Sequence, residues 1–226
     1  MKLLLGMPSP RNIKIVNDNW EKIDEDQIIV KHYKEWSAYQ EIRNYFLSHT
    51  EYTHLAICPD DLIITQKDID ILKRDIVMSD YPVISGICNV NNGEFDLIAV
   101  IIDSIPTLEK STRSFNFNYY SDLKKDITQV LHSGFPLQII RRDIIELIDF
   151  DSDSKLNGGN PDDIGNLDLI FSHRCMELNI PIYCDRRANM IHLRGNNGII
   201  NNNESQRYVK IKRGNMYNFL PGSGGY

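Results

Sequence analysis

The chain has 226 residues, of which 42% are hydrophobic, so it is long enough for one α/β domain with a substantial core. Its 31 acidic and 25 basic residues give a net charge of -6. Proteins that bind nucleic acids are usually basic or carry a basic stripe, so we expect no nucleic-acid partner. The sequence contains no apolar run of the roughly 18 residues that a membrane helix needs, so we expect no transmembrane segment.

The cysteines and the first residues indicate a compartment. Cys58, Cys88, Cys175 and Cys184 form no C-x-x-C pair, and each lies in an apolar run, so we expect buried free thiols rather than a zinc cluster. Free thiols are typical of a reducing compartment. The apolar run at residues 3–5 is too short for the core of a signal peptide. We therefore expect a cytoplasmic protein.

The first half of the chain alternates apolar runs with helical patterns. In chain order, buried strands are expected at residues 3–5, 28–30, 54–58, 82–88 and 97–102, the last two as a hairpin across a turn at 91–93. Apolar residues at helical spacing predict one helix at residues 36–47 and another after Thr65. Thr65 is the expected N-cap of this second helix, with Asp68 at the capping-box position.

The second half continues this alternation, although residues 103–130 give no clear assignment. Beyond them we expect a strand at 135–141, a helix at 142–148, a polar loop at 151–166, a helix at 167–178, and strands at 182–184 and 190–193. Strands that alternate with helices favour an α/β fold with a largely parallel sheet between helices. We place the domain at residues 1–195 and a tail at 196–226, whose basic segment 207–213 is either a flexible lid or a solvated tail.

Asp60 and Asp61 follow directly after an expected buried strand. The carboxyl ends of strands are the place where open α/β sheets bind ligands. Two adjacent carboxylates repel each other unless a cation lies between them, and hard oxygen ligands of this kind suit Mg²⁺ or Mn²⁺. A divalent ion held there would offset the charge of a diphosphate leaving group. The alternative is an ordinary solvated turn, for which Pro-Asp-Asp is also typical.

Two further residues could complete such a site. Asp168 lies in the first turn of an expected helix, where the helix dipole favours a carboxylate whatever its function. His192 lies in the apolar run at residues 189–193, and it is either an ordinary strand residue or an imidazole ligand of the same ion. Each of these residues has a structural explanation when it is taken alone, and their order along the chain is more specific than any one of them.

The order of several segments resembles a known family. The segments are HLAICPDDLII at residues 54–64, YPVISGI at 81–87, GFPLQIIRRD at 134–143, GNLDLIFSHRC at 165–175, and IPIYCD at 180–185 followed by IHL at 191–193. They resemble the GT-A glycosyltransferases, especially the family 2-like enzymes, which include small archaeal and viral members. The resemblance spans residues 3–195 and implies a GT-A-like α/β fold, with a mixed, mostly parallel sheet flanked by helices.

The resemblance also implies metal ligands. The family's Asp-x-Asp motif falls on residues 58–60 or 59–61, and in neither register are both aspartates present. Metal binding is therefore assigned to Asp60 and Asp61 jointly, with either of them as the main ligand. The late metal-binding histidine of the family falls on His192. The implied cofactor is Mn²⁺ or Mg²⁺.

The remaining roles follow from the same resemblance. The family's catalytic base falls on Asp168, although its usual preceding glutamate is Leu167 here. The residues themselves leave Asp162 and Asp163, in the loop before it, as acceptor-binding residues, as an alternative base, or as part of a plain solvated loop. Contacts to the nucleotide or the sugar are implied for Asp60 and for Pro8, Ser9, Arg11, Ser85 and Gly86.

The implied activity is metal-dependent transfer of a sugar from a UDP- or GDP-sugar to a hydroxyl of a glycan, protein or lipid acceptor, with inversion. If the chain is viral, it would act in the cytoplasm of a host cell. A nucleotidyltransferase is one alternative, but that class usually has a glycine-rich phosphate loop after the first strand, and the segment at residues 6–11 has one glycine. A nucleotide-sugar-binding protein without appreciable turnover is the other alternative.

Overall fold

The computed structural model describes residues 1–9, 11, 13–31, 35–90, 97–103, 117–150, 167–193, 208–214 and 216–221, and the statements below concern these residues. They form a ten-stranded sheet in the order β12-β11-β2-β1-β3-β9-β5-β10-β4, with β7 paired to β10 off this path. The strands are β1 (Leu3–Pro8), β2 (Asp26–Lys31), β3 (His54–Ile57), β4 (Leu62–Ile63), β5 (Val83–Cys88), β7 (Ile127–Val130), β9 (Gln138–Arg141), β10 (Ile182–His192), β11 (Tyr208–Arg213) and β12 (Met216–Pro221). A separate small sheet pairs β6 (Val100–Ile101) with β8 (His132–Ser133).

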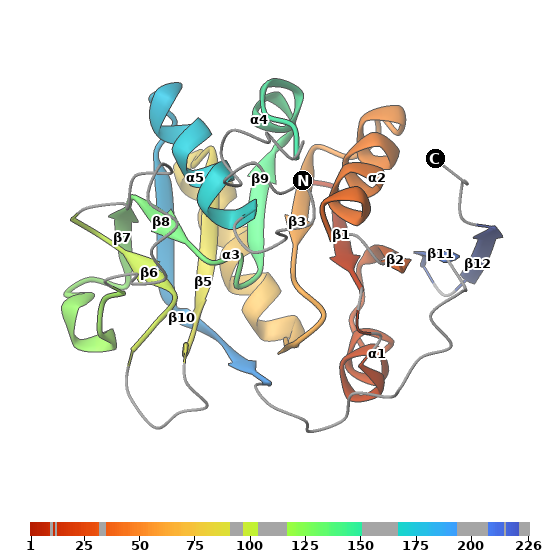
Figure 1. Cartoon of the computed structure of the whole chain (residues 1–226), viewed down its shortest axis with the longest axis horizontal. Coiled ribbons are helices and arrows are strands. Elements are labelled where there is room, and N and C mark those ends of the chain that lie inside the picture. The colour runs from red at the N-terminus through yellow and green to blue at the C-terminus, as the bar shows by residue number, and fades with distance from the viewer. Residues whose placement is uncertain are drawn as a thin grey trace, which may run out of the picture.

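Helices cover both faces of the large sheet (Figure 1). They are α1 (Lys14–Trp20), α2 (Glu35–Ser48), α3 (Gln66–Ser79), α4 (Arg142–Leu147) and α5 (Leu167–Glu177), with a 3-10 turn at Tyr120–Asp122. Side chains alternate along a strand, so Leu4 packs in the core that includes α2, α4 and α5, whereas Leu3 and Leu5 pack in the core that includes α1 and α3. The sheet thus lies between two helical layers.

The strand directions confirm the predicted fold class. β1 pairs in parallel with both β2 and β3, and β5 pairs in parallel with β10. β9 is inserted antiparallel between β3 and β5, and this insertion makes the centre of the sheet mixed. The protein is therefore an α/β protein with a mixed, mostly parallel sheet flanked by helices. Among the described residues, no helix combines the length and the apolar character that crossing a membrane requires.

The start of α3 confirms the predicted capping box. The Thr65 side chain accepts a hydrogen bond from the Asp68 backbone N–H, and the Asp68 carboxylate accepts one from the Thr65 backbone N–H. This reciprocal pair satisfies two backbone donors that the first helical turn leaves without partners. All four cysteines are buried free thiols, as predicted.

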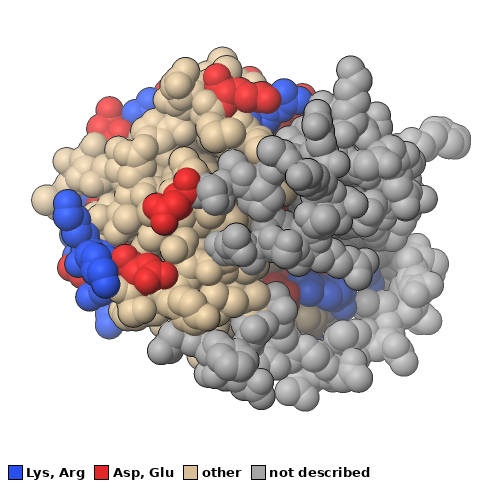
Figure 2. Space-filling view, turned by 60° about the vertical axis from the view of Figure 1, so that its left-hand side comes forward, with Lys and Arg blue, Asp and Glu red and all other residues tan. Residues whose placement is uncertain are grey.

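Some elements differ from the sequence-based expectation. The two strands predicted at 182–184 and 190–193 are one strand, β10, whose register shifts between Cys184 and Asn189. The charged residues at 185–187 interrupt the apolar pattern, and the sequence therefore predicts two strands. In the folded chain, Arg187 forms ion pairs with Asp185 and with Asp75 of α3. On the face drawn in Figure 2, basic and acidic side chains likewise lie beside one another.

The predicted hairpin between β5 and residues 97–102 is confirmed near its turn, where the Val90 N–H donates to the Leu97 carbonyl oxygen and the Ala99 N–H donates to the Cys88 carbonyl oxygen. The turn at 91–93 lies outside the described residues, Ile98 forms an isolated bridge with Asn89, and β6 pairs with β8. The strand predicted at 135–141 begins only at Gln138, because Phe135 and Leu137 both have a φ of 57°, which is outside the β region. Helix α1 is not predicted by the pattern, since only two of its seven residues are buried.

Part of the predicted tail belongs to the sheet. Strand β11 pairs antiparallel with β2, and β12 pairs with β11. Lys212 on β11 is buried, and its ammonium group donates hydrogen bonds to the carbonyl oxygens of Glu21 and Ile23. The expectation of a flexible lid or a solvated tail does not describe residues 208–213, because their backbone and a buried lysine are fixed to the domain. The expected boundary at residue 195 falls within 194–207, outside the described residues.

Candidate functional site

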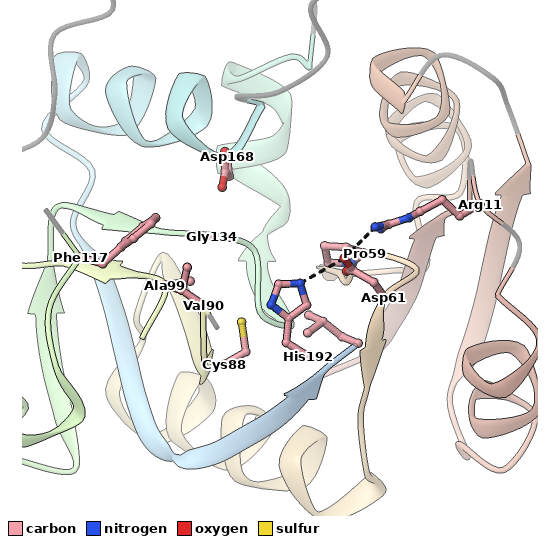
Figure 3. Close-up of a pocket in the computed structure, with 11 residues that line it drawn as sticks. Arg11, Pro59, Asp61, Cys88, Val90, Ala99, Phe117, Gly134, Asp168 and His192 are labelled. Carbon is pink, nitrogen blue, oxygen red and sulfur yellow. Dashed lines mark hydrogen bonds and ion pairs between the residues drawn. The ribbon is translucent and has the colours of Figure 1, made fainter. Parts of the chain in front are cut away.

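A pocket of about 430 Å³ lies where β1, β3 and β5 end, beside the last residue of β10 and the first turn of α5 (Figure 3). The residues that line it are Arg11, Pro59, Asp61, Leu62, Cys88, Val90, Ala99, Phe117, Gly134, Asp168 and His192. Parallel strands that end at one edge bring their following loops together, which is the usual place for ligands in an α/β sheet. Asp61, Asp168 and His192, predicted from three distant segments, therefore share one pocket.

Asp60 is bound by Arg11 and faces away from water. Its side chain is 1% exposed, and its two carboxylate oxygens accept hydrogen bonds from the Arg11 backbone N–H at 2.8 Å and from Arg11 Nε at 2.7 Å. Burial raises the pKa of Asp60, and the charge and hydrogen bonds of Arg11 only partly offset this effect. Asp60 thus anchors Arg11 at the rim of the pocket instead of lining the pocket itself.

Asp61 joins Arg11 to His192. Its Oδ2 atom lies 2.8 Å from Arg11 Nη1 and 3.1 Å from His192 Nε2. Burial acts to raise the pKa of Asp61, but the hydrogen bond with His192 and the charge of Arg11 outweigh burial, so that the pKa is below its usual value. Asp61 is therefore an ionised carboxylate at neutral pH.

The backbone fixes the orientation of the His192 ring. His192 Nδ1 lies 3.0 Å from the carbonyl oxygen of Asn89, and a carbonyl oxygen can only accept, so Nδ1 carries the hydrogen. Nε2 donates to the ionised Asp61 when it also carries a hydrogen, and in the neutral ring its lone pair can instead hold a cation that lies between the two groups. Metal-binding histidines are commonly oriented in this way, by a hydrogen bond from the other ring nitrogen to a carbonyl oxygen.

These residues fit a divalent cation in part. Asp61 and His192 could supply one oxygen and one nitrogen ligand, and ions of this class are often held by one or two protein groups together with phosphate oxygens and water. Asp60 is engaged by Arg11, and no group of three or more potential ligand side chains occurs within the described ranges. An imidazole ligand suits Mn²⁺ better than Mg²⁺, which favours oxygen.

Asp168 lies across the pocket from the Asp61–His192 pair (Figure 3). Its side chain is 32% exposed, and its Oδ1 atom accepts a hydrogen bond from the Leu169 backbone N–H at 2.8 Å. Its Oδ2 atom lies 3.8 Å from Nε2 of the buried His132. A Cβ atom at Gly134 would lie 3.5 Å from Asp168 Oδ2. Because glycine has no Cβ atom, Gly134 does not cover this oxygen. The carboxylate is therefore placed to accept a proton from a group in the pocket.

The other predicted contact residues do not line the pocket. Pro8 and Ser9 are buried at the end of β1, and Ser9 N–H donates to the Val30 carbonyl oxygen. Ser85 is fully buried and accepts a hydrogen bond from Ser133. The space that a side chain at Gly86 would need is occupied by Ala188 and Met190 of β10, so this glycine faces the strand and not a ligand. Asp162 and Asp163 lie outside the described residues.

Two pocket residues, and His132 beside the pocket residue Asp168, are not singled out by the sequence pattern. Phe117 lies in a region without a clear assignment, and Gly134 precedes the left-handed Phe135. His132 lies in the two-residue strand β8, which is too short to give a periodic signal. Only the spatial closeness of His132 to Asp168 reveals it, because 36 positions separate the two residues in the chain.

No family model matches the chain, and no curated protein matches it. Among solved structures, the crystal structure of A197 from STIV aligns with a TM-score of 0.58 and 17% identity, over 86% of this chain and 87% of that chain. A CMP:2-keto-3-deoxy-manno-octonic acid synthetase complexed with CTP aligns with a TM-score of 0.44 and 10% identity, over 84% of this chain and 90% of that chain. An inositol-1-phosphate CTP transferase from T. maritima also has a TM-score of 0.44 and 10% identity, over 88% and 72%. At these values the chain shares its fold with A197.

Proposed function

We propose that the chain is a metal-dependent glycosyltransferase, which moves a sugar from a UDP- or GDP-sugar to an acceptor hydroxyl with inversion. The observation that carries the proposal is the common pocket of Asp61, His192 and Asp168, with the first two on one wall and the third on another (Figure 3). An inverting transfer requires the base and the leaving group on opposite sides of the sugar, and the pocket separates its carboxylates in this sense.

The residues of the first wall suit a diphosphate. Asp61 and His192 would hold Mn²⁺ or Mg²⁺, and when bound this ion would supply positive charge to the leaving diphosphate. The guanidinium of Arg11 lies beside Asp61, and its side chain is 39% exposed, so it can also face phosphate oxygens. Arginine is well suited to this role, because its planar donors match phosphate oxygens in pairs.

The residues of the second wall suit an acceptor. Asp168 would take the proton of the attacking hydroxyl, a role that requires an accessible carboxylate oxygen within hydrogen-bond reach of the substrate. Ala99 and Phe117 line the pocket together with Asp168. They would give an acceptor, whether glycan, protein or lipid, an apolar surface.

The test is a melting-temperature screen of UDP- and GDP-sugars with and without Mn²⁺. A ligand that binds only the folded chain stabilises it by about 2.7 kcal/mol at 100 times its dissociation constant. We expect a rise in melting temperature that needs both the sugar nucleotide and the metal, followed by release of the nucleoside diphosphate in a turnover assay. Pyrophosphate release from CTP or UTP with a sugar phosphate would replace the proposal with a nucleotidyltransferase. Binding without turnover would indicate a nucleotide-sugar-binding protein.

A further inference from the structure

Three short segments beside the pocket pair with one another through their backbones. Asn89 forms an antiparallel bridge with Ile98, which puts Val90 opposite Leu97, and the Val90 N–H donates to the Leu97 carbonyl oxygen at 2.9 Å. Leu97 in turn forms an antiparallel bridge with Tyr119. Side chains directly opposite one another in an antiparallel pair lie on the same face. Val90, Leu97 and Tyr119 therefore form one row of side chains.

This row lies on the pocket side of the three segments. Val90 lines the pocket, whereas Ile98, the neighbour of Leu97, is buried in the core on the other face. The third segment leads to the same conclusion independently, because Phe117 lines the pocket and side chains alternate along an extended segment. Tyr119, two residues after Phe117, is thus on the face that continues the pocket wall.

The ring of Tyr119 is presented to water from a fixed backbone. Tyr119 is 53% exposed, compared with 37% for both Tyr120 and Tyr217. Its backbone N–H donates to the Asp122 carboxylate at 2.8 Å. A tyrosine side chain has two torsion angles to order, so a ligand that stacks on it loses little conformational entropy. The row leads in this way from the buried Val90 in the pocket to an aromatic ring at the surface.

We propose that the row is an acceptor subsite for a glycan, with one sugar ring in the pocket near Asp168 and the next ring stacked on Tyr119. This inference rests on the proposed function and names its acceptor class. Phe117 and Tyr119 are two residues apart, which is about 6–7 Å along an extended segment and comparable to the length of one sugar unit. Figure 3 shows Phe117 across the pocket from Arg11, the residue that the proposed function gives to the donor diphosphate.

The chemistry of the row favours a glycan over a lipid or a peptide. A pyranose ring has a face of C–H groups and a rim of hydroxyl groups, so it can cover the Tyr119 ring while its rim stays in water. An alkyl chain gains free energy only by leaving water, and beside a residue that is 53% exposed it would stay partly hydrated. An extended peptide typically adds a strand to the edge of a sheet, whereas this row crosses the face of three paired segments.

The first arm of the test measures binding and needs no turnover. The probe is an array of defined oligosaccharides, from disaccharides to hexasaccharides, applied to the full chain. We expect Tyr119→Ala to weaken the binding of the oligosaccharide that the wild type binds best by about 3- to 10-fold, and Tyr119→Phe, which keeps the ring, to bind it as the wild type does. Tyr217→Ala is the matched control, since it removes an exposed tyrosine from the edge strand β12. Saturation-transfer NMR should reach the C–H protons of the sugar in the wild type and weaken in Tyr119→Ala.

The second arm measures turnover. Tyr119→Ala should raise KM for the acceptor by the same factor and leave kcat and the donor KM unchanged, because stacking is equal in the ground state and the transition state. Equal oligosaccharide binding by the wild type and Tyr119→Ala would overturn the inference. Binding of no oligosaccharide, whether or not serine peptides or phosphatidylcholine vesicles bind, would also overturn it, and both results leave the proposed function intact. Absence of transfer with every donor would overturn the proposed function, and the array would still decide whether the row binds a glycan.

Discussion

His192 Nε2 lies 3.1 Å from Asp61 Oδ2, although 131 positions separate the two residues in the chain. The last residue of β10 and the loop after β3 meet because β4, within that loop, pairs with the end of β10. The carbonyl oxygen of Asn89, just after β5, turns the imidazole so that Nε2 faces the carboxylate. Three segments of the fold thus cooperate to build one potential ligand pair.

The first prediction concerns this pair. We expect Asp61→Asn and His192→Asn each to weaken Mn²⁺ binding about 10- to 100-fold in the presence of UDP, because each removes one of two protein ligands. Free Mn²⁺ is measured by electron paramagnetic resonance. Asp143→Asn is the control, since this carboxylate is 55% exposed and pairs with Arg141. Equal Mn²⁺ affinity in all three variants would mean that the ion does not bind at this pair.

The second prediction assigns the base. Asp168→Asn removes the proton acceptor but keeps the size of the side chain and its place in the first turn of α5, so we expect kcat to fall about 10²- to 10⁴-fold with little change in KM. Steady-state rates with the donor identified by the melting screen provide the measurement. Asp162→Asn and Asp163→Asn are measured alongside, and a loss confined to one of these variants would move the base to the preceding loop.

The sequence predicts the elements that have a strong local signal. The capping box at Thr65, the helix start at Leu167 and the buried run of β3 all have patterns that need no partner to be recognised. The sequence also predicts three site residues, because Asp61 follows β3, Asp168 lies in the first turn of α5 and His192 ends β10. Their shared pocket shows that element order carries spatial information even where each residue has an ordinary alternative explanation.

The features that the sequence does not predict depend on contacts between distant segments. The direction of β9 is set by its neighbours β3 and β5, and its apolar run has no feature that distinguishes parallel from antiparallel pairing. The continuity of β10 follows from its backbone pairing with β5 and β7, and the ion pair between Arg187 and Asp75 joins residues 112 positions apart. Arg11 is expected near a nucleotide, but its binding to Asp60 at a separation of 49 positions follows only from the fold.

A third prediction follows from the Arg11–Asp60 pair. Arg11→Gln leaves a carboxylate that is 1% exposed without its counter-charge. Breaking a fully buried pair costs about 3–5 kcal/mol, and because the Arg11 side chain is 39% exposed we expect a smaller loss of about 2 kcal/mol. Urea unfolding measures the loss. Asp60→Asn in the Arg11→Gln background should recover part of it, and Arg174→Gln, which removes an exposed pair with Glu177, should change stability by less than about 0.5 kcal/mol. A loss of equal size in Arg174→Gln would refute the assignment.

A fourth prediction distinguishes the role of Gly86 in the packing of the sheet from the role of Gly134 in the pocket. A Cβ atom at Gly86 would lie 2.6 Å from the Ala188 carbonyl oxygen and 2.2 Å from Met190 Cε, so Gly86→Ala should destabilise the fold by about 1–3 kcal/mol. A Cβ atom at Gly134 would lie 3.0 Å from Ala99 Cβ and 3.5 Å from Asp168 Oδ2, so Gly134→Ala should mainly narrow the pocket and lower kcat/KM. Urea midpoints and steady-state rates are measured for both. A loss of activity without a loss of stability in Gly86→Ala would return this glycine to the list of ligand contacts.

A fifth prediction concerns pH and uses His54, at the start of β3. Burial, the N-terminal amino group and Arg141 lower the pKa of His54 from 6.5 to about 4 in the folded chain. The unfolded chain therefore binds the proton first as the pH falls, so the stabilising effect is complete above pH 6.5 and is lost progressively between pH 6.5 and 4. We expect His54→Asn to lose less stability than the wild type between pH 7 and pH 5, in urea unfolding with EDTA present. Parallel losses in the two proteins would show that His54 titrates alike in the folded and unfolded chains, and the buried His132, whose pKa burial also lowers, would then be the group to replace next.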